Sequence, residues 1–151
     1  MKGGASKLPA TLNTFTANTT IESSKVNENF TNLSARIRPT FFFPVDEILS
    51  VGTNKTPVLI ATNTLTIEKV YAVVKTAPVG ASLIMDININ GSSIWATNQA
   101  NRITINSGST TGTSSAFDTT ALSENDQLTL DIDQVGSGTA GANLTVALKC
   151  S

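Results

Sequence analysis

The sequence predicts a mainly β protein, a jelly-roll-like antiparallel β-sandwich preceded by a short α-helix and an extended N-terminal arm. Apolar and polar residues alternate with a period of two from residue 40 onward, whereas residues 23–37 show a helical period. Only 14% of the 151 residues are charged, and Thr, Ser, Asn and Gly are abundant. We therefore divide the chain into an arm (1–20), a helix (21–39) and a head (40–151).

The arm contains Gly3-Gly4 and Pro9 among many Thr and Asn residues, and it shows no apolar period. This composition predicts an extended segment that orders on a partner. The arm also lacks the long apolar run of a secretory signal. No stretch of the chain reaches the roughly 18 apolar residues of a membrane span. We expect a protein that is made in a cytoplasm and does not contact a membrane.

The helix is predicted over residues 23–37, because the hydroxyl of Ser23 or Ser24 can accept a hydrogen bond from a free amide of the first turn. An earlier start is the alternative, since Thr19 and Glu22 have the spacing of a capping box. Both interpretations place the same apolar residues on one side of the helix.

Apolar residues recur along this helix at spacings of four, three and four, which is the seam of a coiled coil. The seam residues are Val26, Phe30, Leu33 and Ile37. The seam spans about two heptads before Pro39 stops the helix, and an isolated helix of this length is marginal in water. It therefore needs a partner, which is either the head of the same chain or further copies of the helix around a symmetry axis. We favour self-association.

The head is predicted to begin at the apolar run Phe41-Phe42-Phe43, as a first strand or as a plug in an interface. The six phenylalanines of the chain are interpreted as core or seam residues. Short strands are expected within residues 45–51 and 56–61, followed by a longer one at 65–75. The apolar positions of the long strand change parity halfway, which predicts a β-bulge near Glu68–Lys69.

The clearest strand is predicted to point Leu83, Met85, Ile87 and Ile89 inward and Asp86, Asn88 and Asn90 outward. Asn90-Gly91 then predicts a type I′ hairpin turn, after which residues 93–96 return along the strand. Residues 102–105 form another predicted strand, with Ile103 and Ile105 inward.

The rest of the head alternates polar connections with apolar strands. Residues 106–120 are rich in Ser, Thr and Gly and are interpreted as a long loop. A Gly-rich turn at 135–141 separates the last two predicted strands. Their inward residues are Leu128, Leu130 and Ile132, then Leu144, Val146 and Leu148. About eight short strands joined by polar turns indicate a jelly roll or a related sandwich.

The composition argues against several classes of function. The net charge is −1 and the ten basic residues are scattered, so nucleic acid is not an expected partner. The chain has no histidine, which removes the commonest general base and the base of a serine triad. We expect no enzyme activity, no cofactor and no metal site.

A few polar residues allow a second interpretation. Asp131 and Asp133 are expected on one strand face, with Glu124 and Asp126 in the preceding turn, and we interpret all four as surface acids. A calcium site and a glycosidase pair are the alternatives. The single cysteine, Cys150, is interpreted as a free terminal thiol, with an intermolecular disulfide as the alternative.

The segment Thr20–Leu33 resembles a short N-terminal motif of tailed-bacteriophage fibre and virion-appendage proteins. In that motif a small-residue helix start precedes an aliphatic residue, Asn-x-Asn-Phe and a leucine, which here correspond to Val26, Asn27-Glu28-Asn29-Phe30 and Leu33. The head is also similar to phage domains in four segments, Ala77–Ala81, Asp86–Ile94, Asp126–Ser137 and Ala140–Val146.

The resemblance implies a homotrimeric structural protein of the virion. Its N-terminal arm would dock on other virion proteins of the capsid or tail, and its β-domain would project outward. Long fibres carry a repetitive shaft that this chain lacks, so a short fibre, a capsid decoration protein or a tail-tip protein fits better.

A second hypothesis is a carbohydrate-binding adhesin that recognises a host-surface glycan. Its expected ligand-binding residues are Asn90, Trp95, Ser109, Thr110 and Thr111. An exposed Trp95 would stack on a sugar ring, but a lone tryptophan in a β-sandwich is more often a core residue. Trimeric avidity would strengthen weak sugar contacts.

Overall fold

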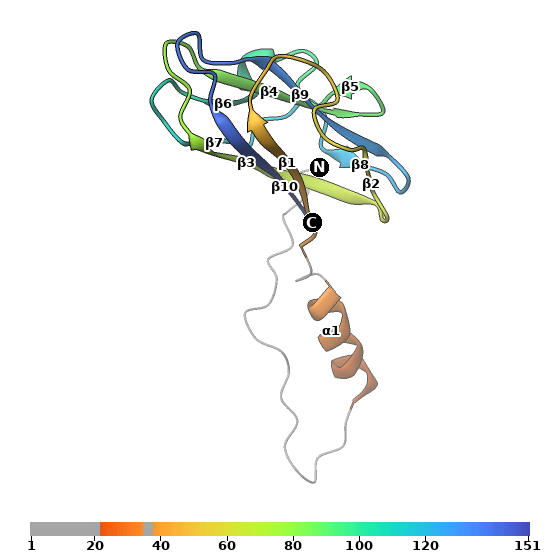
Figure 1. Cartoon of the computed structure of the whole chain (residues 1–151). Helices are drawn as coiled ribbons and strands as arrows, with labels where there is room; N and C mark the ends of the chain where they lie inside the picture. The colour runs from red at the N-terminus through yellow and green to blue at the C-terminus, as the bar shows by residue number, and fades with distance from the viewer. Residues whose placement is uncertain (1–21, 35–37) are drawn as a thin grey trace. The chain divides into compact units, whose positions relative to one another are not determined.

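The computed structural model describes residues 22–30 and 38–151 and the helical backbone of residues 31–34. The chain divides into an N-terminal unit that ends at Arg38 and a second unit, the head, that begins at Pro39 (Figure 1). The described part of the N-terminal unit contains one helix, α1 (Ser23–Ser34). No helix within the described ranges is long and apolar enough to cross a bilayer.

The predicted helix is confirmed over Ser23–Ser34, and its last predicted residues, 35–37, lie outside the described residues. The backbone amides of Lys25 and Val26 donate to the carbonyl oxygen of Glu22, at 3.0 and 3.2 Å. Glu22 therefore occupies the position that precedes the first helical residue, so the prediction that Ser23 or Ser24 caps the helix is wrong. Both serines already lie within the first turn.

The head is a β-sandwich of two antiparallel five-stranded sheets, which confirms the predicted fold class (Figure 1). Sheet A contains β1 (Thr40–Ile48), β3 (Leu65–Thr76), β7 (Thr111–Ser114), β8 (Ala121–Leu122) and β10 (Ala142–Cys150). Sheet B contains β2 (Leu59–Ile60), β4 (Leu83–Ile89), β5 (Ser92–Ser93), β6 (Ile103–Ile105) and β9 (Gln127–Gln134).

Each sheet is four strands wide, because two short strands share one edge of a longer strand. In sheet A the order is β1-β10-β3-β7, and β8 pairs with β3 beyond the segment that β7 occupies. In sheet B the order is β2-β9-β4-β5, and β6 pairs with the other end of β4. A one-turn 3-10 helix, η1 (Gln99–Asn101), precedes β6.

The core between the sheets is built from the predicted inward positions. Apart from Ile89, the predicted inward residues of the later strands are at most 1% exposed: Leu83, Met85, Ile87, Ile103, Ile105, Leu128, Leu130, Ile132, Leu144, Val146 and Leu148. Ile89, at the end of its strand, is only half-buried. Burying this alternating apolar set is the main favourable free energy of the sandwich.

The predicted β-bulge and hairpin turn are both confirmed. Lys69 pairs with Lys149 whereas Ile67 pairs with Cys150, so Glu68 is the extra residue that changes the parity of β3. Asn90 and Gly91 have φ values of 51° and 81°, as a type I′ turn requires, and they join β4 to β5.

Two strand predictions at the start of the head differ from the structure. β1 runs from Thr40 to Ile48, so the phenylalanine run and most of the segment 45–51 form one strand. β1 is an edge strand, so Pro44 can occur in it: a proline has no amide hydrogen, and an edge strand can tolerate this without losing a hydrogen bond to its neighbour. Within the predicted segment 56–61, only the two residues of β2 form a strand.

The segment 106–120 is not one long loop, because it contains β7, whose residues pair with Val70–Val73 of β3. Residues 93–96 also do not return as a full strand. After the two residues of β5 the chain turns inward, and Ile94 and Trp95 are completely buried.

Candidate interaction surface

The outer face of sheet A carries a continuous group of uncharged side chains. Strand pairing places them in two neighbouring rows across four strands, Phe42–Ala147–Tyr71–Thr113 and Pro44–Thr145–Val73–Thr111. We call these eight residues the apolar face. They point away from the core because they alternate with the buried residues of the same strands.

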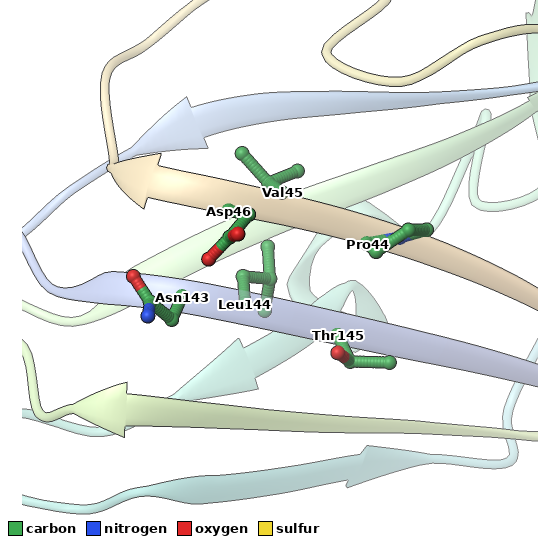
Figure 2. A pocket seen from close by; sticks show the side chains of 6 residues that line it. All are labelled: Pro44, Val45, Asp46, Asn143, Leu144 and Thr145. Atoms are coloured by element: carbon green, nitrogen blue, oxygen red, sulfur yellow. The ribbon is translucent and has the colours of Figure 1, made fainter.

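Three large side chains of the apolar face are exposed to solvent: Phe42 at 58%, Tyr71 at 41% and Val73 at 48%. They border a shallow hollow of about 320 Å³ that crosses all four strands. A second hollow, of about 240 Å³, lies beside it between β1 and β10 (Figure 2). The six phenylalanines were interpreted as core or seam, and for Phe42 this interpretation is wrong because its side chain is outside the core.

Charged side chains lie only at the ends of the apolar face. Lys69 and Lys149 pair in the row at the Cys150 end of β10, and the Lys149 Nζ atom lies 2.9 Å from Glu68 Oε2. The Lys69 Nζ atom lies 4.9 Å from the ring centroid of Tyr71, a cation–π geometry. Asp46 stands beside the second hollow. A partner that covers the two rows would therefore desolvate no charged group at their centre.

The outer face of sheet B is polar and is held by hydrogen bonds among its own side chains. Asp86 and Asn88 point outward as predicted, but they are only 7% and 9% exposed. The Ser93 hydroxyl donates to Asp86 Oδ1 at 2.8 Å, and Asn88 Nδ2 donates to Asp131 Oδ2 at 2.9 Å. We call Asp86, Asn88, Ser93, Arg102, Asp131 and Asp133 the polar face.

Two acids of the polar face have partners that the sequence did not indicate. Asp133 forms an ion pair with Arg102, with 2.6 Å between Oδ2 and Nη1. Burial raises the pKa of the Asp86 carboxyl above its ordinary value, the Ser93 hydrogen bond opposes this rise, and the negative charge of Asp133 adds to it. The interpretation of Asp131 and Asp133 as freely solvated acids is therefore incomplete.

The carboxylates considered for a calcium site accept hydrogen bonds from the protein. Asp131 Oδ1 accepts from the amide of Asn54 at 2.7 Å, in addition to its bond from Asn88. Asp126 accepts from Asn90 Nδ2 and from the amide of Ser123, both at 2.7 Å. Over the described ranges, no group of three or more His, Cys, Asp or Glu residues is arranged to hold a metal ion.

The ring of Trp95 is not available to a ligand in this structure. It is completely buried, Nε1 donates to the carbonyl oxygen of Ala116 at 2.7 Å, and Phe117 packs against it with ring centroids 5.6 Å apart. The core interpretation of Trp95 is confirmed. Asp118 fixes the neighbouring loop, because its carboxylate accepts bonds from the amides of Thr97 and Asn98 and from the Asn98 side chain.

The other residues expected to bind a glycan are not brought together. Asn90 follows one end of β4, whereas Leu83 at the other end pairs with Ile105, which leads into the loop of Ser109 and Thr110. A seven-residue strand spans about 20 Å, so these groups lie at opposite ends of the sandwich. Only Thr111 lies on the apolar face, opposite Val73.

The described residues of α1 take no part in the core of the head. Among the described residues, the buried apolar core extends from Phe43 to Cys150 and includes no residue of α1. Val26 is half-buried and Phe30 is 66% exposed. The side chains of Leu33 and Ile37 lie outside the described residues, so their part of the seam stays a prediction.

Cys150 is a free cysteine, but its thiol is buried in the core of the head. Burial raises the pKa of this thiol to about 11, and the negative charge of Glu68 adds to the rise. Because the thiolate is the reactive form, the folded head disfavours the intermolecular disulfide considered above.

Comparison with protein-family models, with curated proteins and with solved structures gives no match to this chain.

Proposed function

We propose that this chain is a structural protein of a bacteriophage virion, a homotrimeric short fibre or decoration protein. Residues 1–20 anchor it to other virion proteins, the seam of α1 joins three copies, and the head projects outward. The observation that carries this proposal is that, over the described residues, the head builds its core entirely from its own residues. That core uses no described residue of α1, and the apolar positions of α1 have the spacing at which copies of one helix pack against one another.

The topology of the head supports a jelly roll, a fold frequent in capsid proteins. The first four strands alternate between the sheets, with β1 and β3 in sheet A and β2 and β4 in sheet B. The last strands pair with the first ones, since β10 lies between β1 and β3 and β9 lies between β2 and β4. This is the arrangement of a long hairpin rolled into two sheets.

The polar groups of the head support a structural rather than a catalytic role. The polar face uses its carboxylates to bind Ser93, Asn88 and Arg102 of the same head. Such bonds stabilise a sheet, and they leave these acids engaged within the chain. The adhesin alternative has no comparable support, because its expected residues are buried or lie at opposite ends of the sandwich.

The test of the trimer is the native mass of the full chain and of a Phe30→Asp variant, measured by light scattering. We expect a trimer for the full chain and a monomer with a folded β-domain for Phe30→Asp, because a charge cannot be buried in the seam without a large cost. Ser24→Asp is the matched control, since it adds the same charge on α1 away from the seam. A Phe30→Asp chain that stays trimeric would refute the seam assignment.

A second variant removes the helix altogether. It should begin at Arg38, because the carbonyl oxygen of Pro39 accepts the amide of Cys150 at 2.9 Å and belongs to the head. We expect a folded monomer by circular dichroism. The virion assignment is tested by mass spectrometry of purified particles of the phage that encodes the chain. Copy numbers in multiples of three support the proposal, and particles without the chain contradict it.

A further inference from the structure

We propose that the apolar face packs against other copies of this chain, so that the three heads meet around the axis of the helical seam. This inference rests on the trimer proposed above and names a second surface that the trimer would bury. Its occupant is a second copy of the head. Four observations lead to it: the short connection from α1, the place of β1, the charge of the two outer faces, and the area of the apolar face.

The connection between α1 and the head is short enough to hold three heads close together. Six peptide steps separate Ser34, the last residue of α1, from Thr40, the first residue of β1. They reach at most about 21 Å. Helices in a bundle lie roughly 8–10 Å apart, and a compact unit of this size is about 35 Å across. Three heads on such connections are therefore held close to one another.

The apolar face begins immediately after this connection. Phe42 and Pro44 belong to β1, the first strand of the head, and β1 forms the edge of sheet A. The remaining residues of the face follow on the next three strands of the same sheet. A surface that starts two residues into β1 is within reach of the neighbouring copies.

Charge also favours the apolar face over the polar face as the meeting surface. Copies that meet through the apolar face bring together only uncharged side chains at the centre of the contact. Copies that met through the polar face would bring Asp131 and Asp133 close to the same acids of a neighbour. Like charges at a contact are repulsive, and partly buried ones are repelled more strongly than exposed ones.

The chemistry of the hollow fits an apolar partner. Its lining combines Phe42, Tyr71 and Val73 with small residues of the neighbouring strands, and no charged side chain lines it. Sugar sites need several polar groups that fix hydroxyls, whereas a second head brings Phe42 and Pro44. We therefore assign the face to a copy of the chain and treat a sugar as an outcome that the test can reveal.

The area of the apolar face explains why it would act only together with the helix. Four strands and two rows cover roughly 300 Å², well below the about 800 Å² that each partner buries in a standard interface. Such a face does not hold heads together in dilute solution. A short connection raises their local concentration to about the millimolar range, which makes a weak contact form. The isolated head should be monomeric and the full trimer should have this face covered.

The experiment compares the labelling of single introduced cysteines by a maleimide in the full chain. Val73→Cys reports on the apolar face, and Ser92→Cys, an exposed position on β5 of sheet B, is the matched control. Each is measured in the otherwise native chain and together with Phe30→Asp. Native Cys150 contributes little background, since a pKa of about 11 keeps its thiol protonated.

We expect Val73→Cys to react at least about tenfold more slowly in the trimer than in the Phe30→Asp monomer, because covering a site slows its modification. Ser92→Cys should react at the same rate in both. Thr113→Cys, in the other row of the face, should behave like Val73→Cys. A trimer in which Val73→Cys reacts as fast as in the monomer overturns the inference and leaves the trimer proposal intact.

Two further outcomes separate this inference from the proposed function. If the full chain is a monomer by light scattering, the trimer proposal fails and this inference fails with it. If Val73→Cys reacts slowly in both trimer and monomer, a segment of the same chain covers the face, which also overturns the inference. If a monosaccharide, but not trimer formation, slows the labelling of Val73→Cys, the face is a sugar site instead.

Discussion

The two outer faces of the head follow the same strand alternation and yet are opposites. On sheet B, Asp86 is 7% exposed although it points away from the core, because side chains around it hydrogen-bond to it and to one another. On sheet A, Phe42 is 58% exposed and lines a shallow hollow. The polar face is complete within one chain, whereas the apolar face leaves apolar area in water.

The comparison teaches that the direction of a side chain and its burial are separate properties. Direction follows from parity along a strand. Burial of an outward residue depends on whether its neighbours in the sheet and nearby loops can pair with it. A polar residue with such neighbours is covered by its own chain. An outward aromatic residue stays in contact with water unless another protein surface packs against it.

The largest effect is expected where the two sheets that carry these faces meet. A Cβ atom at Gly112 of β7 would overlap the carbonyl oxygen of Thr104 in β6. Gly112→Ala should therefore destabilise the head by about 3 kcal/mol, because a backbone must move. Gly108→Ala is the control. A Cβ atom there would meet open space, so the substitution should cost only the backbone strain of an alanine at φ +80°, about 1 kcal/mol. Urea unfolding measures both, and equal losses would contradict the close approach of the sheets.

The next effect separates the two faces directly. Asp131→Ala removes the acceptor of the Asn54 amide and of the Asn88 side chain, and should cost about 2 kcal/mol of unfolding free energy. Asp46 is an exposed acid on the outer face of β1. Asp46→Ala should therefore change the free energy of unfolding by less than about 0.5 kcal/mol. Chemical denaturation of the Phe30→Asp monomer keeps trimer dissociation out of the measurement. Equal costs would mean that the bonds of the polar face do not stabilise it.

The smallest effect concerns pH. The pKa of Asp86 in the folded head is raised above its ordinary value of 3.8, so the folded state binds this proton more tightly than the unfolded state. This contribution to stability is fully present below 3.8 and is lost as pH rises through the folded pKa. Asp86→Asn should abolish this part of the pH dependence, measured by urea unfolding from about pH 3 to about pH 7.

Ser93→Ala sharpens that measurement. The Ser93 hydroxyl lowers the pKa of Asp86 by its hydrogen bond, so its removal should raise that pKa further and extend the loss of stability to higher pH. If Asp86→Asn and the native chain have the same pH profile, burial does not perturb this carboxyl.

Much of the head could be predicted from local patterns. The bulge at Glu68 appears as a parity change within β3, and the turn at Asn90-Gly91 is encoded by two residues that tolerate positive φ. The core positions of the later strands follow from their period of two. These features depend on neighbours in the chain, so the amino-acid order suffices to predict them.

Other features depend on residues far apart in the chain. The serine- and threonine-rich segment 106–120 contains β7 because the edge of β3 accepts it, and no local apolar pattern marks that strand. The residues expected to bind a glycan show the same dependence, because the connections that hold Asn90 and Ser109 follow opposite ends of β4. The sequence allows Trp95 to be either a core residue or a ligand-binding residue, and the bond from its Nε1 atom to the carbonyl oxygen of Ala116 holds its ring in the core.

By itself, the sequence determined the class of fold, the presence of the helix, and which side of each strand faces the core, because helical and strand periods are properties of consecutive residues. Only the tertiary structure decided that Phe42, Tyr71 and Val73 form one surface. They come from two strands that β10 brings together, and non-local pairing registers set their distances. The same pairing buried Asp86 and Asn88, which their outward parity alone would leave in water.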